Sequence, residues 1–548
     1  MDLQSKCIVL GVALMGGLLL YGCSSREGAV RSENIRAHLS ALASDQMEGR
    51  GPGTPGGQKA ADYIAGAFAE AGLKPAVDGG YMQPVQMVGL SAADGSLFEW
   101  NEDGQRVPLE SPEQCVANPG VVEEAVSLED VPMVFVGYGI NAPEVPWNDY
   151  QDLDVKGKVV VSLVNDPPSD DPSFFGGAAL TYYGRWTYKL EEAARQGAAG
   201  VILIHNTEMA GYPWSVVQSS WSGEQFNLPR GGEKSTALEG WISQDTADAL
   251  FQRDDFSFAE AVQRAGQRGF KPIPLSTRVS FHARPEVREV ESPNVVGWIE
   301  GSDPSLKQEY IVLTSHYDHL GVGPEIAGDR IYNGALDNAS GTALLIEVGR
   351  VLAAHRAELG RSLVLVAVTG EEQGLLGSEY YVQHPVFPLD RTVANINFDG
   401  VNVWGETEDM VAMGAERSTI RNVVQAVFSE LNINRIADPF PDKGYFFRSD
   451  QFSFVKAGVP AVYFDYGLRF RGKPADWGEK LMQEYVAKHY HQPSDEYDPQ
   501  WPLDGAVQMG QVVVRTVELL SKQTDRPRWN EGDPFSRVAS QAAQPSTP

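Results

Sequence analysis

The sequence is poor in cysteine and in positive charge, and each shortage excludes a class of protein. Its 548 residues include three cysteines, Cys7, Cys23 and Cys115, which are too few for a disulfide scaffold or for a multi-cysteine zinc or iron–sulfur site. Any metal site must therefore use nitrogen and oxygen ligands. Lys and Arg number 44 against 73 Asp and Glu, and the resulting formal charge of −29 argues against nucleic acid as a partner.

The chain also lacks the composition of a polytopic membrane protein or of a wholly disordered one, since 42% of its residues are hydrophobic and 21% are charged. Residues 7–20 form an apolar run after Lys6 that is shorter than the ~20 residues of a membrane span but typical of a signal-peptide core. The run ends in LYGC, which resembles the lipobox of bacterial lipoproteins. We therefore predict a signal peptide over residues 1–22, lipidation of Cys23 and a tether over residues 23–36.

The lipobox resemblance also predicts where the protein resides. Ser24 follows the cysteine, and by this resemblance a residue other than Asp favours the outer membrane. We expect a protein of the bacterial cell envelope that faces the periplasm, held by a lipid anchor. An ordinary signal peptide with an incidental cysteine is the alternative. Lipidation of Cys23 would leave Cys115 as the only free thiol, and we interpret Cys115 as a structural residue.

Strand-like and helix-like patterns alternate along most of the chain, which favours an α/β fold. Residues 58–73 predict an amphipathic helix with Gly72 at its end, and the Gly/Pro-rich sequence EGRGPGTPGG before it marks close backbone approach. A second helix is expected over residues 339–355. Near-continuous apolar runs predict strands of a sheet that is covered on both faces, at residues 293–300, 310–315, 362–368, 393–398 and 460–464.

The middle of the chain has a different pattern, with a strand over residues 131–139 and a βαβ-like passage over residues 158–205. Its segments GYGINAPE, DVKGKVVV and EEAARQGAAGVILI resemble the protease-associated domain that is often inserted into peptidases. We assign residues 118–285 to such a β-rich domain and interpret His205, at the end of a buried strand, as structural. Residues 526–548 are rich in Pro, Ser and Gln, which predicts a disordered tail.

Polar residues follow three of the predicted strands at the point where each strand ends. Residues 310–315 run into His316 and Asp318, residues 362–368 into Glu371 and Glu372, and residues 393–398 into Asp399. Because open α/β sheets place their sites at the carboxyl ends of parallel strands, we expect these side chains to converge in one crevice.

Two further residues extend this set. Asp337 lies in GALDNASG at the start of the second predicted helix, and His491 lies in YHQPSDEYD after the last predicted strand. Two histidines and three carboxylates from this set, with no softer ligand, would suit two zinc ions that share a bridging carboxylate. Two metal ions ~3.5–4 Å apart are an arrangement used for hydrolysis. His319 and His489 are competing nitrogen ligands.

Six motifs in this order and spacing resemble the co-catalytic di-zinc aminopeptidase family, which includes the glutamate carboxypeptidase relatives. They are SHYDHLG, IYNGALDNASG, TGEEQGLLGS, INFDG, RSDQFSF and YHQPSDEYD. The match covers about residues 37–73 and 292–522. The resemblance implies a zinc-exopeptidase domain formed by residues 37–117 and 286–525, with a mixed, mostly parallel sheet between helices on both faces.

The resemblance also assigns the metal ligands. His316, Asp337, Glu372, Asp399 and His491 would hold two zinc ions, with Asp337 as the bridge. In the family's usual pattern His316 shares a zinc ion with Asp399, and Glu372 shares the other with His491. The residues alone leave this pairing open.

Four other residues receive roles from the same resemblance. Glu371 would be the general base that takes a proton from the metal-activated water and passes it to the leaving amine. Asp318 would accept a hydrogen bond that fixes the imidazole of a ligand histidine. Tyr490 would help to stabilise the tetrahedral oxyanion, and Arg448 would bind substrate.

The sequence departs from the family pattern at two positions. Leu336 replaces an aspartate of many relatives, but the bridging aspartate before Asn338 is kept. Gln451 replaces a histidine that is common after the Ser-Asp pair, which affects a contact behind the ligands. The family also has a cis peptide after its bridging aspartate, so we expect one between Asp337 and Asn338.

The resemblance favours a zinc-dependent exopeptidase that hydrolyses N-terminal residues from peptides. A carboxypeptidase of the glutamate carboxypeptidase type is the main alternative, and it would need several basic residues in its pocket, for which Arg448, Arg469 and Arg471 are candidates. A mono-zinc glutaminyl cyclase-like transferase and a non-catalytic binding protein are disfavoured by the complete ligand set. Residue preference, oligomeric state and the role of the inserted domain are not specified by the sequence.

Overall fold

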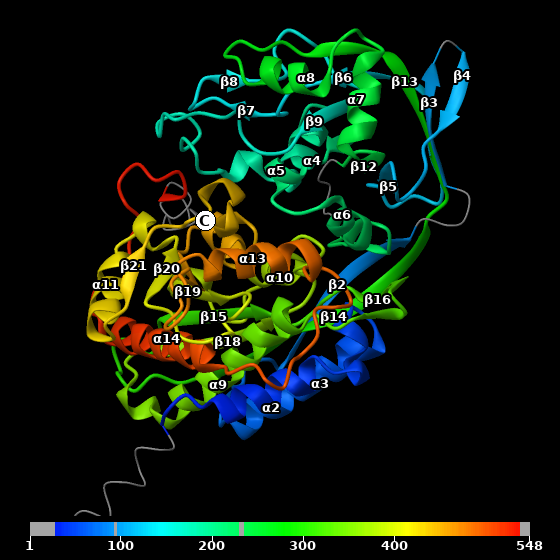
Figure 1. Cartoon of the computed structure of the whole chain (residues 1–548). Coiled ribbons are helices and arrows are strands. Elements are labelled where there is room, and N and C mark those ends of the chain that lie inside the picture. The colour runs from blue at the N-terminus through cyan, green and yellow to red at the C-terminus, as the bar shows by residue number, and fades with distance from the viewer. Residues whose placement is uncertain (1–27, 92–95, 103, 230–234, 537–548) are drawn as a thin grey trace, which may run out of the picture.

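The computed structural model describes residues 28–91, 96–102, 104–229 and 235–536, which form two domains, each built around its own sheet (Figure 1). The predicted signal peptide, Cys23 and the first residues of the tether lie outside these ranges. Within the described part of the chain, no helix combines the length and the apolar character that crossing a membrane requires.

The first domain contains a ten-stranded mixed sheet. Its four central strands are parallel: β18 (Ser362–Val368), β15 (Tyr310–His316), β19 (Thr392–Phe398) and β22 (Ala461–Tyr466). Parallel pairing is largely confined to this centre. The flanking strands are β2 (Met82–Ser91), β14 (Glu286–Ile299), β1 (Lys74–Pro75) and β11 (Gln225–Asn227) on one side, with β20 (Asp409–Met413) and β21 (Asn434–Ile436) on the other.

Helices cover both faces of this sheet, as the near-continuous apolar strands predict. In β15, Ile311 and Leu313 contribute to the core on one face, whereas Val312 contributes to the core on the opposite face. The first face carries α2 (Ser32–Leu42), α3 (Pro55–Glu70), α9 (Ser340–Ala354), α11 (Ile420–Glu430) and α14 (Asp504–Lys522). The second carries α10 (Leu376–Gln383) and α12 (Gln451–Lys456). Both predicted helices, α3 and α9, are present, which confirms the α/β fold class.

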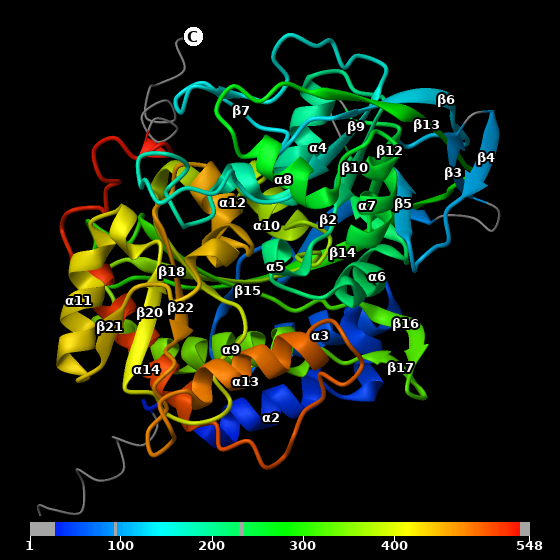
Figure 2. The same cartoon turned by 45° about the horizontal axis from the view of Figure 1, so that its top comes forward.

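The second domain contains an eight-stranded sheet in the order β4-β3-β13-β6-β9-β10-β12-β5 (Figure 2). These strands are β3 (Leu97–Glu102), β4 (Gln105–Pro108), β5 (Cys115–Pro119), β6 (Val126–Phe135), β9 (Val159–Leu163), β10 (Gly200–Ile204), β12 (Leu238–Ile242) and β13 (Ile273–Ala283). The predicted βαβ passage is formed by β9, α4 (Trp186–Arg195) and β10. The domain also contains α7 (Gln244–Gln252), α8 (Phe258–Ala265) and the small pair β7 (Asn141–Ala142) and β8 (Trp147–Asn148).

The domain boundary lies earlier than residue 118, where the sequence pattern placed it. Strands β3, β4 and β5 precede that residue, yet all three pair within the second sheet, and β5 is hydrogen-bonded to β12. The chain therefore passes from the first domain to the second between β2 and β3. Conversely, β11 lies within the inserted segment but pairs with β2 in the first sheet. The reason is that strand partners distant in sequence decide sheet membership, and no local pattern reports them.

Two residues interpreted as structural are buried. Cys115, in β5, is a free thiol in the apolar core of the second domain. His205 follows β10, and its Nε2 lies 3.0 Å from the backbone oxygen of Tyr212.

The C-terminal segment was expected to be disordered from residue 526, but residues 526–536 pack on the first domain. Trp529 donates its Nε1–H to the carbonyl of Gly458 at 2.8 Å, and the ring of Phe535 lies 5.9 Å from that of Phe452. Two aromatic side chains in a polar segment thus provide enough apolar surface to hold it in place. Residues 537–548 lie outside the described ranges.

Candidate metal centre

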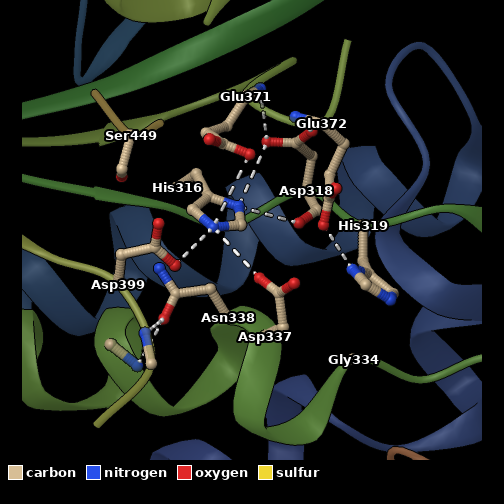
Figure 3. Close-up of polar contacts among 12 residues, drawn as sticks. His316, Asp318, His319, Gly334, Asp337, Asn338, Glu371, Glu372, Asp399 and Ser449 are labelled. Atoms are coloured by element: carbon tan, nitrogen blue, oxygen red, sulfur yellow. Dashed lines mark hydrogen bonds and ion pairs between the residues drawn. The ribbon is translucent and has the colours of Figure 1, made fainter. Parts of the chain in front are cut away.

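Loops at the carboxyl ends of the parallel strands bring the predicted polar residues together (Figure 3). His316 ends β15, while Glu371 and Glu372 follow β18 and Asp399 follows β19. Asp337 lies at the entrance to α9 and is 8% exposed. His491, which is 7% exposed, lies in the loop after α13 (Trp477–Lys488).

The carboxylate of Asp337 lies between two histidines and offers one oxygen to each. Its Oδ1 is 3.3 Å from His316 Nε2, and its Oδ2 is 3.3 Å from His491 Nε2. His316 Nε2 also lies 3.2 Å from Asp399 Oδ1, and His491 Nε2 lies 3.1 Å from Glu372 Oε2. The geometry thus groups His316 with Asp399 and His491 with Glu372, which is the pairing of the family pattern.

The peptide between Asp337 and Asn338 is cis, as expected from the resemblance. The Asn338 side chain fixes this segment, because its Oδ1 accepts the backbone N–H of Gly341 at 2.9 Å and of Gly400 at 3.1 Å. Its Nδ2–H donates to the carbonyl of Phe398 at 3.0 Å. The Asp337–Asn338 segment is therefore tied to the end of β19.

Asp495 holds the same segment from the other side, and the sequence analysis assigned it no role. Its carboxylate accepts the backbone N–H of Leu336 at 3.0 Å and of Asp337 at 3.1 Å. Tyr485, in α13, donates its hydroxyl hydrogen to Asp495 at 3.1 Å. Leu336, where many relatives have an acid, thus takes part through its backbone alone.

Asp318 contacts both the Glu371–Glu372 loop and His316. Its carboxylate accepts the backbone N–H of Glu371 at 3.2 Å and of Glu372 at 3.4 Å. The Nδ1 of His316 lies 3.2 Å from the backbone oxygen of Asp318, closer than the 3.8 Å to its carboxylate. Burial raises the pKa of the Asp318 carboxyl to about 7, although the nearby His316 opposes the shift. Asp318 therefore orients the imidazole mainly through its carbonyl and the Glu371–Glu372 loop through its side chain.

Electrostatics at the site are dominated by buried acids. Burial raises the pKa of Glu371 well above its usual value, and the neighbouring Asp399 and Glu372 add to the shift while His316 opposes it. For Asp337, burial acts in the same upward direction, but hydrogen bonds from His316 and His491 hold its pKa well below the usual range. In His491, burial is likewise outweighed by Glu372 and Asp337, which raise the pKa of the imidazole to about 10.

Of the two competing histidines, the described structure brings only His319 to the cluster. Its Nδ1 lies 2.6 Å from Glu372 Oε1, and the side chain is fully buried. His319, Asp337 and Glu372 form one group whose spacing could hold a metal ion. His489 instead lies outside the cluster, with its Nδ1 3.0 Å from Ser494 Oγ.

The donor set fits divalent metal ions. His316, Asp337 and Asp399 form a second group whose ligand atoms lie within 4.8 Å of one another. Among the residues that the structure describes, the Nε2 atom of His319 is buried without a hydrogen-bond partner. Buried carboxylates at this density need positive charge, and imidazole and carboxylate without thiolate are ligands that zinc accepts.

A cleft beside the cluster is lined by both domains. The first domain contributes Glu371, Glu372, Gly374, Leu375, Arg448, Tyr490 and His491, and the second contributes Arg185, Trp186, Tyr212, Val216, Val217, Ser220 and Trp221. Both predicted substrate-side residues, Tyr490 and Arg448, therefore face this cleft. The ring of Tyr490 lies 4.0 Å from that of His491, and Arg448 donates to the carbonyl of Ala210 at 2.9 Å.

Arg50 is a buried cation that the sequence analysis left in a loop. Its guanidinium donates to four backbone carbonyls, at 2.5–2.9 Å: those of Leu42, Tyr317, Asn333 and Gly334. Tyr317 follows His316 directly, and Gly334 precedes α9 closely, so this contact joins the two segments that carry His316 and Asp337. The many glycines around Arg50 were the sequence signal for this close packing. A Cβ on Gly49, for example, would lie 2.4 Å from the carbonyl of Gly321.

Gln451, which replaces a histidine of the family pattern, is buried and makes hydrogen bonds through both ends of its amide. Its Oε1 accepts from Asn397 Nδ2 at 2.8 Å, and its Nε2 donates to the carbonyl of Phe446 at 2.8 Å. It thus links α12 to β19 behind the candidate metal ligands.

Comparison with known proteins finds relatives of this chain. Residues 294–517 match the family model described as Peptidase family M28. Aminopeptidase YwaD of Bacillus subtilis strain 168 is 22% identical over 379 residues, which are 68% of this chain and 65% of that protein. A probable zinc metalloprotease of Pyrenophora tritici-repentis is 44% identical over 91 residues, which are 16% of this chain and 18% of that protein. Each match thus spans less than two thirds of the relative.

The fold has a counterpart among solved structures. The aminopeptidase from Aneurinibacillus sp. strain AM-1 aligns with 91% of this chain and 98% of its own, at a TM-score of 0.53 and 20% sequence identity. This similarity confirms the predicted mixed α/β fold.

Proposed function

Because residues 294–517 match the model of Peptidase family M28, we propose that this chain is a zinc-dependent exopeptidase that removes N-terminal residues from peptides. The observation that carries the proposal is the position of Asp337, whose two carboxylate oxygens face two separate histidines, each of which is paired with another acid. A carboxylate placed in this way suits a bridge between two metal ions.

Two zinc ions would be held by His316 with Asp399, and by His491 with Glu372, and Asp337 would serve both. When bound, they would activate a water molecule and stabilise negative charge on the substrate carbonyl. His319 supports Glu372 through its short contact with Oε1.

Glu371 is the proposed proton carrier. It lines the cleft, its Oε2 lies 4.0 Å from His316 Nε2, and its backbone N–H is held by Asp318. From this position its carboxylate takes a proton from the attacking water and donates it to the nitrogen of the leaving amine. Burial raises the pKa of Glu371, which favours retention of the proton between these two steps.

Tyr490 and Arg448 act on the substrate. Burial raises the pKa of Tyr490 well above its usual value, so its hydroxyl stays protonated and donates a hydrogen bond to the oxyanion. Arg448 lies in the cleft with its guanidinium 5.2 Å from the ring of Tyr212. We assign it to substrate binding.

One observation favours the carboxypeptidase alternative. Arg185 lines the cleft with Arg448, and its Nε is buried without a hydrogen-bond partner in the described residues. Two guanidinium groups there suit a substrate carboxylate. Of the other two candidates from the sequence, Arg471 pairs with the exposed Glu406, and neither it nor Arg469 lines the cleft.

We also propose that the second domain is a protease-associated domain, on the basis of its βαβ passage and its position as an insertion.

A lipid on Cys23 would hold the protein at the membrane of the bacterial cell envelope, facing the periplasm. Mass spectrometry of the protein isolated from a membrane fraction should detect an N-terminal peptide that begins with a lipid-modified Cys23. An unmodified Cys23 would contradict the anchor.

Activity on matched substrates tests the function. Aminoacyl substrates with a free amine are compared with N-blocked peptides that have a free carboxylate, before and after chelation and after zinc is added back. We expect cleavage of the free-amine substrates, loss with chelator and recovery with zinc. Cleavage of only the blocked peptides would instead establish the carboxypeptidase.

A further inference from the structure

Helix α6 (Trp214–Trp221) of the second domain places Ser220 against a proposed metal ligand of the first domain. Ser220 Oγ lies 2.7 Å from His491 Nδ1. The two residues come from different domains, and both line the cleft. A side chain of the inserted domain thus contacts a histidine of the metal centre directly.

The orientation of the His491 ring determines which atom of this contact donates the hydrogen bond. Its Nε2 faces the carboxylates of Asp337 and Glu372 at 3.3 and 3.1 Å. A nitrogen that binds a metal must be unprotonated, so the proton of the neutral ring is on Nδ1, which then donates to Ser220 Oγ. Hydrogen bonds of this kind fix the tautomer and the plane of a ligand histidine.

The second domain holds Ser220 firmly. At the start of α6, Trp214 Nε1 donates to the carbonyl of Pro112 at 3.0 Å, and Gln218 Nε2 donates to the same carbonyl at 3.1 Å. At its end, the ring of Trp221 packs 5.2 Å from Trp186 and 5.9 Å from Trp241. The helix is therefore held by contacts within its own domain.

The chain after α6 ties this helix to the ligand loop. Gln225 Nε2 donates to the carbonyl of Ser220 at 3.1 Å, and β11 begins at Gln225 and pairs with β2 of the first sheet. Phe226 donates its backbone N–H to Gln373 Oε1 at 3.0 Å, and Gln373 is the residue after Glu372. The position of Ser220 is thus linked to both members of the His491–Glu372 pair.

We propose that Ser220 is a positioning residue for metal binding at His491 and Glu372, so that docking of the inserted domain and occupancy of this site stabilise each other. This inference rests on the proposed function, in which His491 is a zinc ligand. The inserted domain then contributes to the metal centre itself as well as to the wall of the cleft.

Zinc affinity of the metal-free full-length protein tests this inference. Competition with a chromophoric chelator gives the two dissociation constants for wild type, Ser220→Ala, Ser220→Thr and Ser219→Ala. Loss of a hydrogen bond to a ligand histidine weakens metal binding by about 10–100-fold. We expect that loss at one of the two sites in Ser220→Ala, and near-normal affinity in Ser220→Thr, which keeps the hydroxyl.

Ser219→Ala is the matched control, because among the described residues Ser219 Oγ bonds only to the carbonyls of Ser215 and Val216 in its own helix. Equal affinities in Ser220→Ala and wild type, or equal losses in Ser219→Ala and Ser220→Ala, would overturn the inference. A wild-type protein that binds no zinc would overturn the proposed function and this inference with it.

Hydrogen exchange gives an independent measurement. Coupling is reciprocal, so zinc should slow amide exchange over residues 214–227 in the wild type and have a smaller effect in Ser220→Ala. Exchange in this segment that is unaffected by zinc in the wild type would also overturn the coupling.

Discussion

The carboxylate of Asp318 lies beneath Glu371 and accepts its backbone N–H at 3.2 Å. Because the same carboxylate accepts from the next residue, it sets the direction in which the Glu371–Glu372 loop leaves β18. Asp318 is fully buried, so its two acceptor bonds are made without competition from water.

Asp318→Asn should lower activity while the protein remains folded. The amide keeps the shape of the side chain but can accept with only one atom, so one of the two backbone N–H groups loses its partner. Perturbation of such supporting contacts costs about 10–100-fold in activity or metal affinity. Steady-state kinetics and zinc titration measure both. Asp303→Asn, which alters a carboxylate near the surface that accepts from Ser305, is the control.

Glu371→Gln should retain both zinc ions yet lose turnover. The amide cannot carry a proton between water and the leaving amine, and loss of general acid–base catalysis costs about 10²–10⁴-fold in kcat. Metal analysis and kcat are measured on the same preparation. Glu379→Gln, in α10, alters an acid outside the cleft and should be active. A Glu371→Gln enzyme with substantial turnover would remove Glu371 from its role.

His491→Gln and His319→Gln should differ in zinc content. His491 Nε2 faces two carboxylates, so its loss should reduce the bound zinc from two ions to one. His319 faces Glu372 through Nδ1, so its loss should weaken binding without removing an ion. Zinc per chain after gel filtration distinguishes them. The reverse result would assign the second nitrogen ligand to His319.

Stability should fall in mildly acidic solution because of His205. Burial lowers the pKa of this imidazole to about 4, whereas the unfolded chain has its ordinary value near 6.5. The unfolded state therefore binds more protons between these values. The stabilisation is complete above pH 6.5 and is lost as pH falls toward 4, by up to about 3 kcal/mol.

Denaturant unfolding at pH 7.5 and pH 5 measures this dependence. His205→Gln, which removes the titrating group, should be less sensitive to pH over this range than the wild type. The control is His282→Gln, since His282 lies near the surface beside Glu129. An unchanged pH dependence in His205→Gln would exclude His205 as its source.

The sequence predicted those parts of the molecule whose signals are local. The apolar run of residues 362–368 coincides with β18, and residues 310–315 with β15, because buried parallel strands need apolar side chains on both faces. The candidates His316, Glu372 and Asp399 were found because they lie at the carboxyl ends of these two strands and of β19. Their convergence depends on strand order, which the α/β arrangement constrains.

The parts that the sequence did not predict depend on contacts between distant segments. Ser220 and His491 are 271 residues apart, and nothing in the sequence around Ser220 indicates its partner. The same is true of Asp495, which reaches Leu336 across 159 residues. The boundary before β3 was missed because the pairing of β5 with β12 decides it.

The ribbon formed by β2 and β14 has a consequence for biosynthesis. These strands are adjacent in the first sheet, with Ser91 opposite Glu286, although the whole second domain is translated between them. Pairing them in an unfolded chain would require closure of a very long loop, which is slow. A second domain that folds first brings its two ends together and shortens that search. Since domains generally fold as units during synthesis, we expect the inserted domain to fold first and thereby to promote the pairing of β2 with β14 in the first domain.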